Sequence, residues 1–493
     1  MRRAALTLAG FASVLSGCTV GPDYAAPKSV VPPAYGEPQS VAGAAVDPAQ
    51  WWTIFGDPEL TSLIERALAD NPSIELAASR VRQARLQEIE ARGVGLPTVD
   101  AMANATNVRF SKNAGFSSIA KAFGGQSGSN PGSGPGSGSP PSGGVALPGD
   151  GITTFAVGFD ANWELDLFGR GARTREAALA ASEAAVWTGR DAAVTLAAEV
   201  ADAYFAYRLD QAQIAVLRKE IADQQRIVTL VAHRGATGLV PAVDAVRQDR
   251  AVTATQARLL PLEADARIRI HALGILLGKD PEAVSEELTG PLPDLGAVPA
   301  IPSGLPSDLL RRRPDIRAAE RRIAAASAQI GVATADLYPR FSLTGIAELI
   351  STNLATLFQG DSVQTTASAA AMFPILDWGR RKAVLHEREE DRAQAYIQYR
   401  QTVLTALKDV EDALVRIDKE RARHAVLERA LADAEQSARA VDARYRTGFV
   451  AQDPVLDAQV QVLTAREQLA ASDAQLRQQT ASLFKALGGG WSE

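Results

Sequence analysis

Leu376-Asp377-Trp378-Gly379-Arg380 precedes the longest helical pattern of the chain, and its end matches Phe168-Gly169-Arg170, 210 residues earlier. Other segments recur at fixed offsets as well. Two more matches keep the offset of 210: Thr237-Gly238 with Thr447-Gly448, and Leu277-Gly278 with Leu487-Gly488. Two matches farther upstream have an offset of 242: Asn71-Pro72-Ser73-Ile74 with Arg313-Pro314-Asp315-Ile316, and Leu96-Pro97 with Tyr338-Pro339. Self-similarity at fixed offsets indicates an internal repeat. The chain is therefore predicted to be a duplication.

The two offsets differ by 242 − 210 = 32 residues, so the extra residues lie between Pro97 and Phe168. This interval contains the Gly- and Ser-rich stretch Ser127 to Gly138. Such a composition gives a flexible segment that cannot pack a core. We expect a surface loop over residues 111–151. Its glycines are not a phosphate-binding loop, because no Gly-Lys-Ser/Thr sequence ends it.

Each repeat is predicted to follow one plan: helix, strand, loop, strand, very long helix, tight turn, helix. Repeat 1 is expected over residues 57–278 and repeat 2 over 304–490, with a Pro- and Gly-rich connector at 279–303. The shorter helical segments, each of about 40 residues, are 57–95, 239–278, 304–338 and 452–488.

Two segments alternate with the period of two that is typical of strands. In repeat 1, apolar residues alternate with small or polar ones at Phe155, Val157, Phe159, Ala161, Trp163 and Leu165. In repeat 2 the alternation is less regular, from Phe341 to Ile350. The segments run about 10 to 12 residues, close to the length of a tilted transmembrane strand. Alternation alone is equally compatible with soluble hairpins.

From Arg380 to Arg446 a seven-residue spacing selects mainly apolar residues: Tyr396, Val403, Val410, Ile417, His424, Leu431, Ala438 and Tyr445. The equivalent positions of repeat 1 are Val186, Ala193, Val200, Tyr207, Ile214, Ile221 and Val228. Heptads sustained over this length predict supercoiled helices. A helix of about 65 residues spans about 100 Å, because each residue adds 1.5 Å.

The N-terminus has the pattern of an export signal. Arg2 and Arg3 precede the apolar stretch Ala4 to Val14, and Leu15-Ser16-Gly17-Cys18 follows. A charged region, a short apolar region and small residues at the end define such a signal. The last four residues resemble a bacterial lipobox, so residues 1–17 are expected to be removed and Cys18 to be acylated. Residues 18–56 would then be a lipid-anchored, extended segment.

Composition excludes several classes of protein. With 1 cysteine and 4 histidines, a disulfide framework, a Cys-type zinc site and a haem attachment motif are ruled out. The net charge of -6 argues against nucleic acid as a partner. His386 and Glu390 could share a metal, yet such a spacing is usually a solvated helix face. The sequence therefore predicts no enzyme, no metal and no cofactor other than the lipid on Cys18.

The sequence resembles the TolC-type outer membrane efflux factors, in particular their NodT- or OprM-like lipoprotein branch. The motifs that carry the resemblance are Cys18-Thr19-Val20-Gly21-Pro22-Asp23-Tyr24, Trp51-Trp52 with Phe55-Gly56-Asp57, Leu309 to Glu320, Leu376 to Arg380, and Val455-Leu456-Asp457-Ala458. The resemblance implies a mainly α protein with a transmembrane β part. Three chains would each give four strands to a 12-stranded barrel, continued by a helical coiled-coil tunnel across the periplasm. Pooling of strands also follows from physics, because lipid-exposed sheet edges are not tolerated.

The resemblance further implies a homotrimer in the Gram-negative outer membrane, working with a periplasmic adaptor (membrane fusion) protein and an inner-membrane RND-type transporter. The chain would be the passive exit duct of a tripartite efflux pump for small molecules. Two alternatives remain open: the duct of a type I protein secretion system, and a non-conducting coiled-coil envelope lipoprotein. A copper duct is disfavoured, because thioether ligands suit copper and only Met102 and Met372 follow the signal.

Site residues are expected at the turns between long and short helices. Each turn glycine precedes an apolar pair, and these are the expected adaptor contacts: Gly238, Leu239 and Val240, and Gly448, Phe449 and Val450. In the family, aspartates six and nine residues after this glycine narrow the closed mouth. Asp457 matches that pattern, Pro454 departs from it, and Asp453 lies one place early. In repeat 1 the same positions hold Asp244 and Arg247. Arg247 is the expected counter-charge for Asp457.

Overall fold

The computed structural model describes residues 19–28, 31–36, 47–109, 151–238, 241–290, 308 and 311–491. These residues form two compact units. The sheet unit contains Glu90–Arg175 and Gln329–His386, with the N-terminal residues up to Pro22. The helical unit contains Asp23–Ile89, Glu176–Ala328 and Glu387–Glu493. Cys18, residues 110–150, and Leu239 and Val240 lie outside the described residues.

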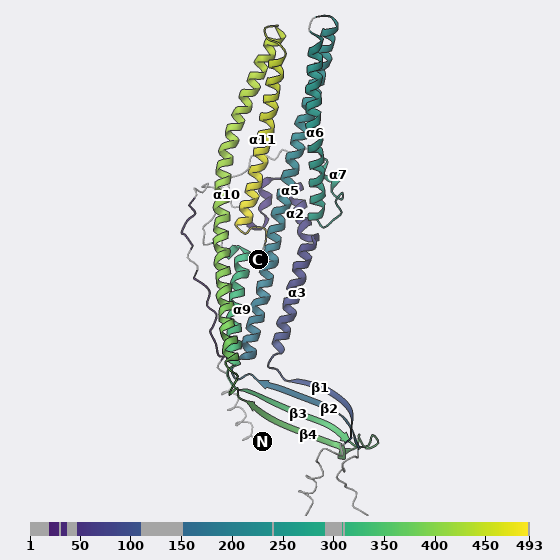
Figure 1. The fold of residues 1–493 in the computed structure, drawn as a ribbon, viewed down its shortest axis with the longest axis vertical. Helices are drawn as coiled ribbons and strands as arrows, with labels where there is room; N and C mark the ends of the chain where they lie inside the picture. Colours follow the sequence, from purple (N-terminus) through teal and green to yellow (C-terminus); the bar gives the residue numbers. More distant parts are fainter. Residues whose placement is uncertain are drawn as a thin grey trace, which may run out of the picture. The chain divides into compact units, whose positions relative to one another are not determined.

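The helical unit is built from two helical hairpins (Figure 1). The long helices each have 67 residues, and α6 and α11 return beside them: α5 (Arg170–Ala236), α6 (Ala242–Leu276), α10 (Arg380–Arg446) and α11 (Asp453–Ala486). The remaining helical elements are η1 (Pro48–Phe55), α2 (Pro58–Asp70), α3 (Pro72–Gly93), α7 (Ser285–Leu288) and α9 (Pro314–Ala335). The predicted long helices are confirmed, and each ends at the expected glycine.

Prolines break two of the segments that were expected to be continuous helices. Segment 57–95 is two helices that meet at Asn71, whose ψ of 128° is extended. A residue before proline is disfavoured in the helical conformation, and Pro72 follows Asn71. In repeat 2, Pro314 likewise starts α9. Two smaller differences are that the N-terminal segment ends in η1 and the connector contains α7.

The heptad seam is buried only in the middle of the long helices. On α10, Val403, Val410 and Ile417 are buried, whereas Tyr396, one heptad before Val403, is 41% exposed. On α5, Val200, Tyr207 and Ile214 are buried. Helical packing in one chain therefore accounts for only part of the apolar surface that the heptads create.

The sheet unit contains one antiparallel sheet with the strand order β1-β2-β3-β4 (Figure 1). The strands are β1 (Thr98–Arg109), β2 (Gly151–Leu165), β3 (Arg340–Ser351), which is followed by the short η2 (Gly360–Ser362), and β4 (Val363–Met372). Each repeat thus supplies a hairpin, and β2 pairs with β3 between the repeats.

The two faces of the sheet differ in polarity, because residues directly opposite each other on paired strands share a face. One face carries mainly apolar side chains: Val99, Ala101, Ala103, Val157, Phe159, Ala161, Trp163, Leu165, Phe341, Leu343, Ala347, Leu349, Val363, Ala367, Ala369 and Ala371. The opposite face is mainly polar: Thr98, Asp100, Asn104, Thr106, Thr154, Asp160, Asn162, Glu164, Ser342, Thr344, Glu348, Gln364, Thr366 and Ser368. The apolar exceptions on the polar face are Met102, Val108, Ile152, Ile346, Ile350 and Met372.

The core of the helical unit forms around the Trp51-Trp52 motif. The Trp51 ring is fully buried and stacks on Phe484 of α11, with ring centroids 5.4 Å apart. Phe55 packs edge-on against Phe205 of α5 at 4.8 Å. The N-terminal segment therefore packs against both repeats.

Asp57 connects this core to the start of α2. Its carboxylate accepts hydrogen bonds from the backbone N–H groups of Glu59 (2.9 Å) and Leu60 (3.2 Å), and so caps the helix. The Tyr204 hydroxyl of α5 also donates to this carboxylate. Burial, together with the hydrogen bond to Asp57, raises the pKa of Tyr204.

Residues just after Cys18 are fixed within the sheet unit. The backbone N–H of Val20 donates to the carbonyl of Phe168 (3.2 Å), and Arg173 Nε donates to the carbonyl of Val20 (3.2 Å). Gly21 has a φ of 91°, and a Cβ there would lie 2.5 Å from the Cα of Gly331. Only glycine fits at this close approach.

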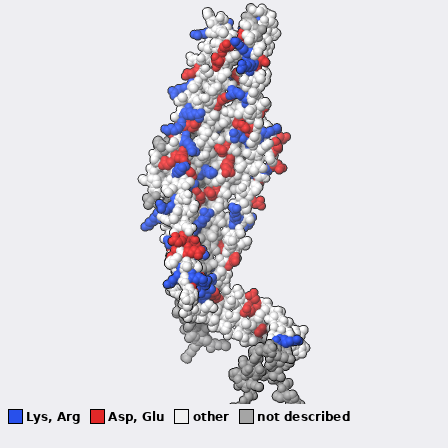
Figure 2. Space-filling view, viewed as in Figure 1, with Lys and Arg blue, Asp and Glu red and all other residues white. Residues whose placement is uncertain are grey.

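Charges of both signs are interspersed over the helices on the face shown in Figure 2. That face has no broad basic area among the described residues, which agrees with the small net charge. In the described part of the chain, no helix combines the length and hydropathy needed to cross a membrane.

Candidate functional site: the tips of the helical hairpins

The long helices of the two hairpins end in the same way. Gly238 and Gly448 adopt left-handed φ values of 75° and 77°, which favour glycine. Before each glycine a threonine hydroxyl donates to carbonyls of the last helical turn: Thr237 to Arg234 at 3.0 Å, and Thr447 to Arg444 at 3.0 Å. The predicted role of both glycines as helix terminators is confirmed.

The second tip is a complete Schellman cap. The N–H of Gly448 donates to the carbonyl of Tyr445 (3.0 Å), and the N–H of Phe449 donates to the carbonyl of Arg444 (2.9 Å). The Phe449 side chain is left 82% exposed, and Val450 is half-buried. This tip therefore presents an aromatic ring to solvent.

Polar contacts join the hairpins close to the tips, between α6 and the start of α11. Gln452 Nε2 donates to Gln248 Oε1 at 2.8 Å, and both side chains are buried. Arg247 Nη1 lies 3.3 Å from Asp453 Oδ2 and 3.8 Å from Asp244 Oδ1. Asp244 and Asp453 are in the first turns of α6 and α11, where the helix dipole favours negative charge.

The structure thus brings together three of the four predicted gating residues. Within the chain Arg247 contacts Asp453, not Asp457, which is exposed. Asp457 has no ion pair among the residues described here. The expected pairing of Asp457 with Arg247 concerned chains assembled around an axis, and it stays a prediction.

Further ion pairs brace each hairpin and link the two. Arg218 of α5 reaches Glu263 of α6 at 2.7 Å within one hairpin. Arg466 of α11 reaches Glu435 of α10 at 2.7 Å, and this hydrogen bond lowers the pKa of Glu435. A third pair crosses between the hairpins, from Arg258 to Glu467 at 2.6 Å. Sequence analysis missed these pairs, because no pattern in one dimension shows which helix faces meet.

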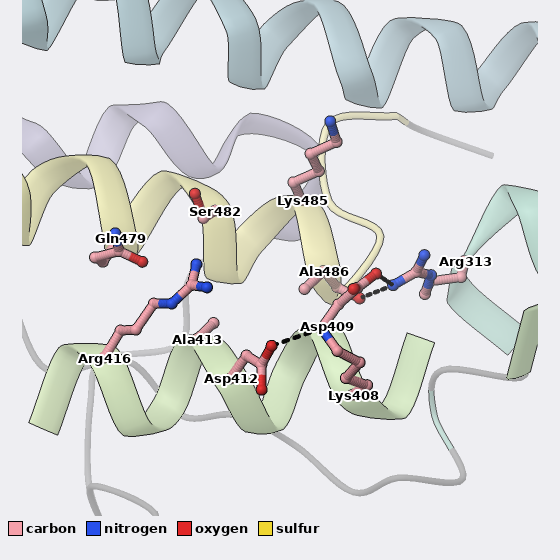
Figure 3. A pocket seen from close by; sticks show the side chains of 10 residues that line it. All are labelled: Arg313, Lys408, Asp409, Asp412, Ala413, Arg416, Gln479, Ser482, Lys485 and Ala486. Carbon is pink, nitrogen blue, oxygen red and sulfur yellow. Dashed lines mark hydrogen bonds and ion pairs between the residues drawn. The ribbon is translucent and has the colours of Figure 1, made fainter. Parts of the chain in front are cut away.

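A polar cavity of about 390 Å³ lies farther along α10 and α11 (Figure 3). Arg313 occupies one end, where it pairs with Asp315 (2.7 Å) and Asp409 (3.2 Å) and donates to the carbonyl of Ala486 (3.1 Å). Lys408 pairs with Asp412 at 2.7 Å. The Arg-Pro-Asp-Ile motif therefore ties α9 to α10 and α11, which is a structural role.

The described residues contain no group of three or more His, Cys, Asp or Glu side chains that could bind a metal ion. His424 lies on the α10 seam, with Nδ1 3.8 Å from Glu428 Oε1. What the tips offer is a cluster of charges, Arg247 with Asp244 and Asp453, and the exposed ring of Phe449.

Comparison with known proteins agrees with this geometry. The family model described as "Outer membrane efflux protein" matches residues 63–279 and 305–489, one segment in each repeat. The chain belongs to the outer membrane efflux protein family. The antibiotic efflux pump outer membrane protein ArpC of Pseudomonas putida is 30% identical over 504 residues, covering 100% of this chain and 97% of ArpC. The outer membrane protein OprJ of Pseudomonas aeruginosa is 32% identical over 493 residues, covering 98% of this chain and 95% of OprJ.

Solved structures of this family have the same fold. The outer-membrane channel OprN superimposes with a TM-score of 0.83 at 30% identity, over 96% of this chain and 100% of OprN. The open state of the Neisseria gonorrhoeae outer membrane channel MtrE superimposes with a TM-score of 0.78 at 26% identity, over 96% of this chain and 99% of MtrE. The predicted family and fold class are confirmed, and this family member is an outer membrane protein.

We predict that the hairpin contact at Arg247 restrains opening of the mouth. An exposed ion pair contributes up to about 1 kcal/mol, so Arg247→Ala or Asp453→Ala should raise the open-to-closed ratio by up to about fivefold. Asp457→Ala should raise conductance as well if its carboxylates narrow the mouth. Single-channel recording in planar bilayers measures these changes.

Arg218→Ala is the matched control, since it breaks an ion pair within one hairpin and leaves the contact between hairpins intact. It should leave conductance unchanged. Parental conductance in the Arg247, Asp453 and Asp457 variants would assign all three residues to a solvated helix face.

Proposed function

We propose that the protein is the outer membrane duct of a tripartite efflux pump, through which small molecules leave passively. The sheet carries this proposal. Its strands have 10 to 15 residues, one apolar face and one polar face. Transmembrane β-structure requires an apolar face toward lipid and a polar face toward an aqueous lumen. A soluble sheet of this size would leave its apolar face in water.

A homotrimer is the second part of the proposal. Among the described residues β1 and β4 each have one neighbouring strand, so each has one unpaired edge. Unpaired backbone groups cannot face lipid, and four strands are too few to close on themselves. Three copies would supply a closed barrel of 12 strands, the number expected for this family.

The helices fit a tunnel that crosses the periplasm toward an adaptor protein and an RND-type inner-membrane transporter. A helix of 67 residues spans about 100 Å. The tips, with the exposed Phe449, would be the adaptor contact. A passive duct needs no catalytic group, and we propose that the protein is not an enzyme.

We also propose that Cys18 carries the acyl chains that anchor the mature N-terminus. The next residues support this, because Val20 and Gly21 are held against Phe168 and Gly331 in the unit that carries the sheet. The described residues that directly follow Cys18 are thus held in the sheet unit. Several acyl chains are needed for stable anchoring, since each buried methylene contributes about 0.8 kcal/mol.

A planar-bilayer measurement tests the channel function. We expect purified protein to form stable conducting pores, and deletion of the gene to increase susceptibility to a panel of small toxic compounds. A non-conducting envelope lipoprotein would give neither result. Conductance with unchanged susceptibility and loss of a secreted protein would instead indicate a secretion duct.

The adaptor contact is tested at the tips. Replacing Phe449 and Leu239 with aspartate should abolish cross-linking to the adaptor, since a carboxylate cannot pack in an apolar contact. The assembly of the variant should stay intact, because Phe449 is exposed. Phe358→Asp is a matched control, as this phenylalanine is 74% exposed and far from both tips in sequence. Normal adaptor cross-linking in the tip variant would contradict the assignment.

The lipid anchor is tested by mass spectrometry of the mature N-terminal peptide. We expect a peptide that starts at Cys18 and carries the added mass of diacylglycerol and an N-acyl chain. Cys18→Ser should leave the signal uncleaved at this site and the protein without lipid. A mature chain with a free Cys18 thiol would contradict the proposal.

A further inference from the structure

The residues that follow α11 differ from their counterparts in the other repeat. Helix α11 ends at Ala486, and residues 487–491 continue without regular secondary structure. The first two of them match Leu277-Gly278, and both glycines have a left-handed φ, 75° at Gly488 and 69° at Gly278. Repeat 1 then continues with Lys279-Asp280-Pro281, whereas repeat 2 has Gly489-Gly490-Trp491. The duplication therefore does not explain the Gly-Gly-Trp sequence.

The two glycines of this sequence lie where a larger residue would not fit. A Cβ at Gly489 would lie 2.8 Å from the carbonyl oxygen of Pro48 and 3.1 Å from Cδ1 of Trp51. Gly490 has a φ of 106°, and its N–H donates to the same carbonyl of Pro48 at 2.7 Å. Glycine is needed where two stretches of backbone approach so closely. Residues 489 and 490 therefore contact η1, the last element of the N-terminal segment, through the backbone.

The Trp491 ring is held by a cluster of aromatic and cationic side chains. It packs edge-on against Trp187 of α5, with ring centroids 5.3 Å apart. The guanidinium carbon of Arg190 lies 4.4 Å from the Trp187 centroid and 4.5 Å from the Trp491 centroid. Arg317 of α9 lies 5.1 Å from the Trp187 centroid, and Trp491 Nε1 donates to the carbonyl of Arg312 at 3.2 Å. Cations are attracted to the faces of indole rings, so the cluster attaches this ring to both repeats.

We infer that residues 487–491 form a clasp that couples docking of η1 to the packing of α5 and α9. The clasp has two attachments, the Trp491 ring on the helices and the Gly490 N–H on the carbonyl of Pro48. These attachments belong to adjacent residues, so release of the ring also removes the restraint on the hydrogen bond. Coupling between two sites is reciprocal. Docking of η1 therefore also stabilises the closed clasp.

The clasp gives the N-terminal segment a conformational control that core packing alone would not supply. Trp51 of η1 already stacks on Phe484 of α11, a residue outside the clasp. If that stack held η1 by itself, the state of Trp491 would not affect η1. With the clasp, η1 is released more often whenever the Trp491 ring leaves α5 and α9. The inference does not depend on the channel function or on acylation of Cys18.

Hydrogen exchange of the full-length protein in detergent, read by mass spectrometry, tests the coupling, because amide exchange reports local opening. Trp491→Ala removes the ring and keeps both glycines. We expect exchange over residues 47–56 to become faster by a factor of about 5 to 30, the effect of losing one well-packed cationic and aromatic contact. Exchange in strands β1 to β4 should keep the parental rate, which shows that the variant is folded.

Two further tryptophan variants calibrate this result. Trp378→Ala is the matched control, since it removes an indole that is 91% exposed and outside the cluster. It should leave exchange over residues 47–56 unchanged. Trp491→Phe keeps an aromatic ring beside Trp187 and Arg190 but lacks the Nε1 donor to Arg312. It should give a smaller increase than Trp491→Ala.

The reciprocal effect is tested from the side of η1. The Asp47 carboxylate accepts from the N–H of Ala49 at 2.9 Å and caps η1. Asp47→Ala loosens the first turn of η1, which includes Pro48, without changing any residue of the clasp. We expect faster exchange over residues 487–491 in this variant. A purely local role of Trp491 would leave that exchange at the parental rate.

Parental exchange over residues 47–56 in Trp491→Ala, with intact strands, overturns the inference. If Trp491→Ala instead exchanges faster throughout the protein, the two milder variants decide. Faster exchange over 47–56 in Trp491→Phe, together with faster exchange over 487–491 in Asp47→Ala, supports the clasp. Parental rates in both of these segments show that η1 docks independently of Trp491, and so overturn it.

Discussion

Backbone hydrogen bonding along the strands is the constraint on which the rest of this structure depends. In the described part of the chain, the backbone N–H and C=O groups of the two inner strands, β2 and β3, are paired on both sides. One edge of β1 and one edge of β4 are left unpaired. In water such edges would be solvated, but the apolar face of this sheet is suited to lipid, where unpaired N–H and C=O groups are costly. The proposed homotrimer would pair these edges. Large apolar side chains of α3 and α10 are exposed as well, among them Leu76, Leu86 and Leu404.

The duplication explains why the two halves of the chain share one plan. Each repeat contributes a hairpin, a long helix and shorter helices, and the repeats contact each other through β2 and β3 and through α5 and α9. Equivalent positions of the repeats differ in size and exposure: Leu76 and Leu86 of α3 are exposed, whereas Ala318 and Ala328 of α9 are buried.

Motifs that mark the family serve mainly to hold this arrangement. Trp51 stacks on Phe484, Asp57 caps α2 and accepts from Tyr204, and Arg313 joins α9 to α10 and α11. At both tips a glycine in the left-handed conformation ends the long helix, whereas the charges that follow the glycines differ. Exposed ion pairs such as Arg247 with Asp453 contribute little stability.

The sequence by itself determined the duplication, the long helices, the strands that alternate, and the glycines that end α5 and α10, because each leaves a local or periodic signature. It also indicated the family and the residues at the tips. The tertiary structure alone decided which partner each charge takes. Within the chain Arg247 contacts Asp453 of the other hairpin, because helix rotation selects the facing side chain and no periodicity in the sequence records it. The helices break before Pro72 and Pro314 because the residue before a proline disfavours the helical conformation. The helical pattern of the sequence had nevertheless predicted continuous helices at both places.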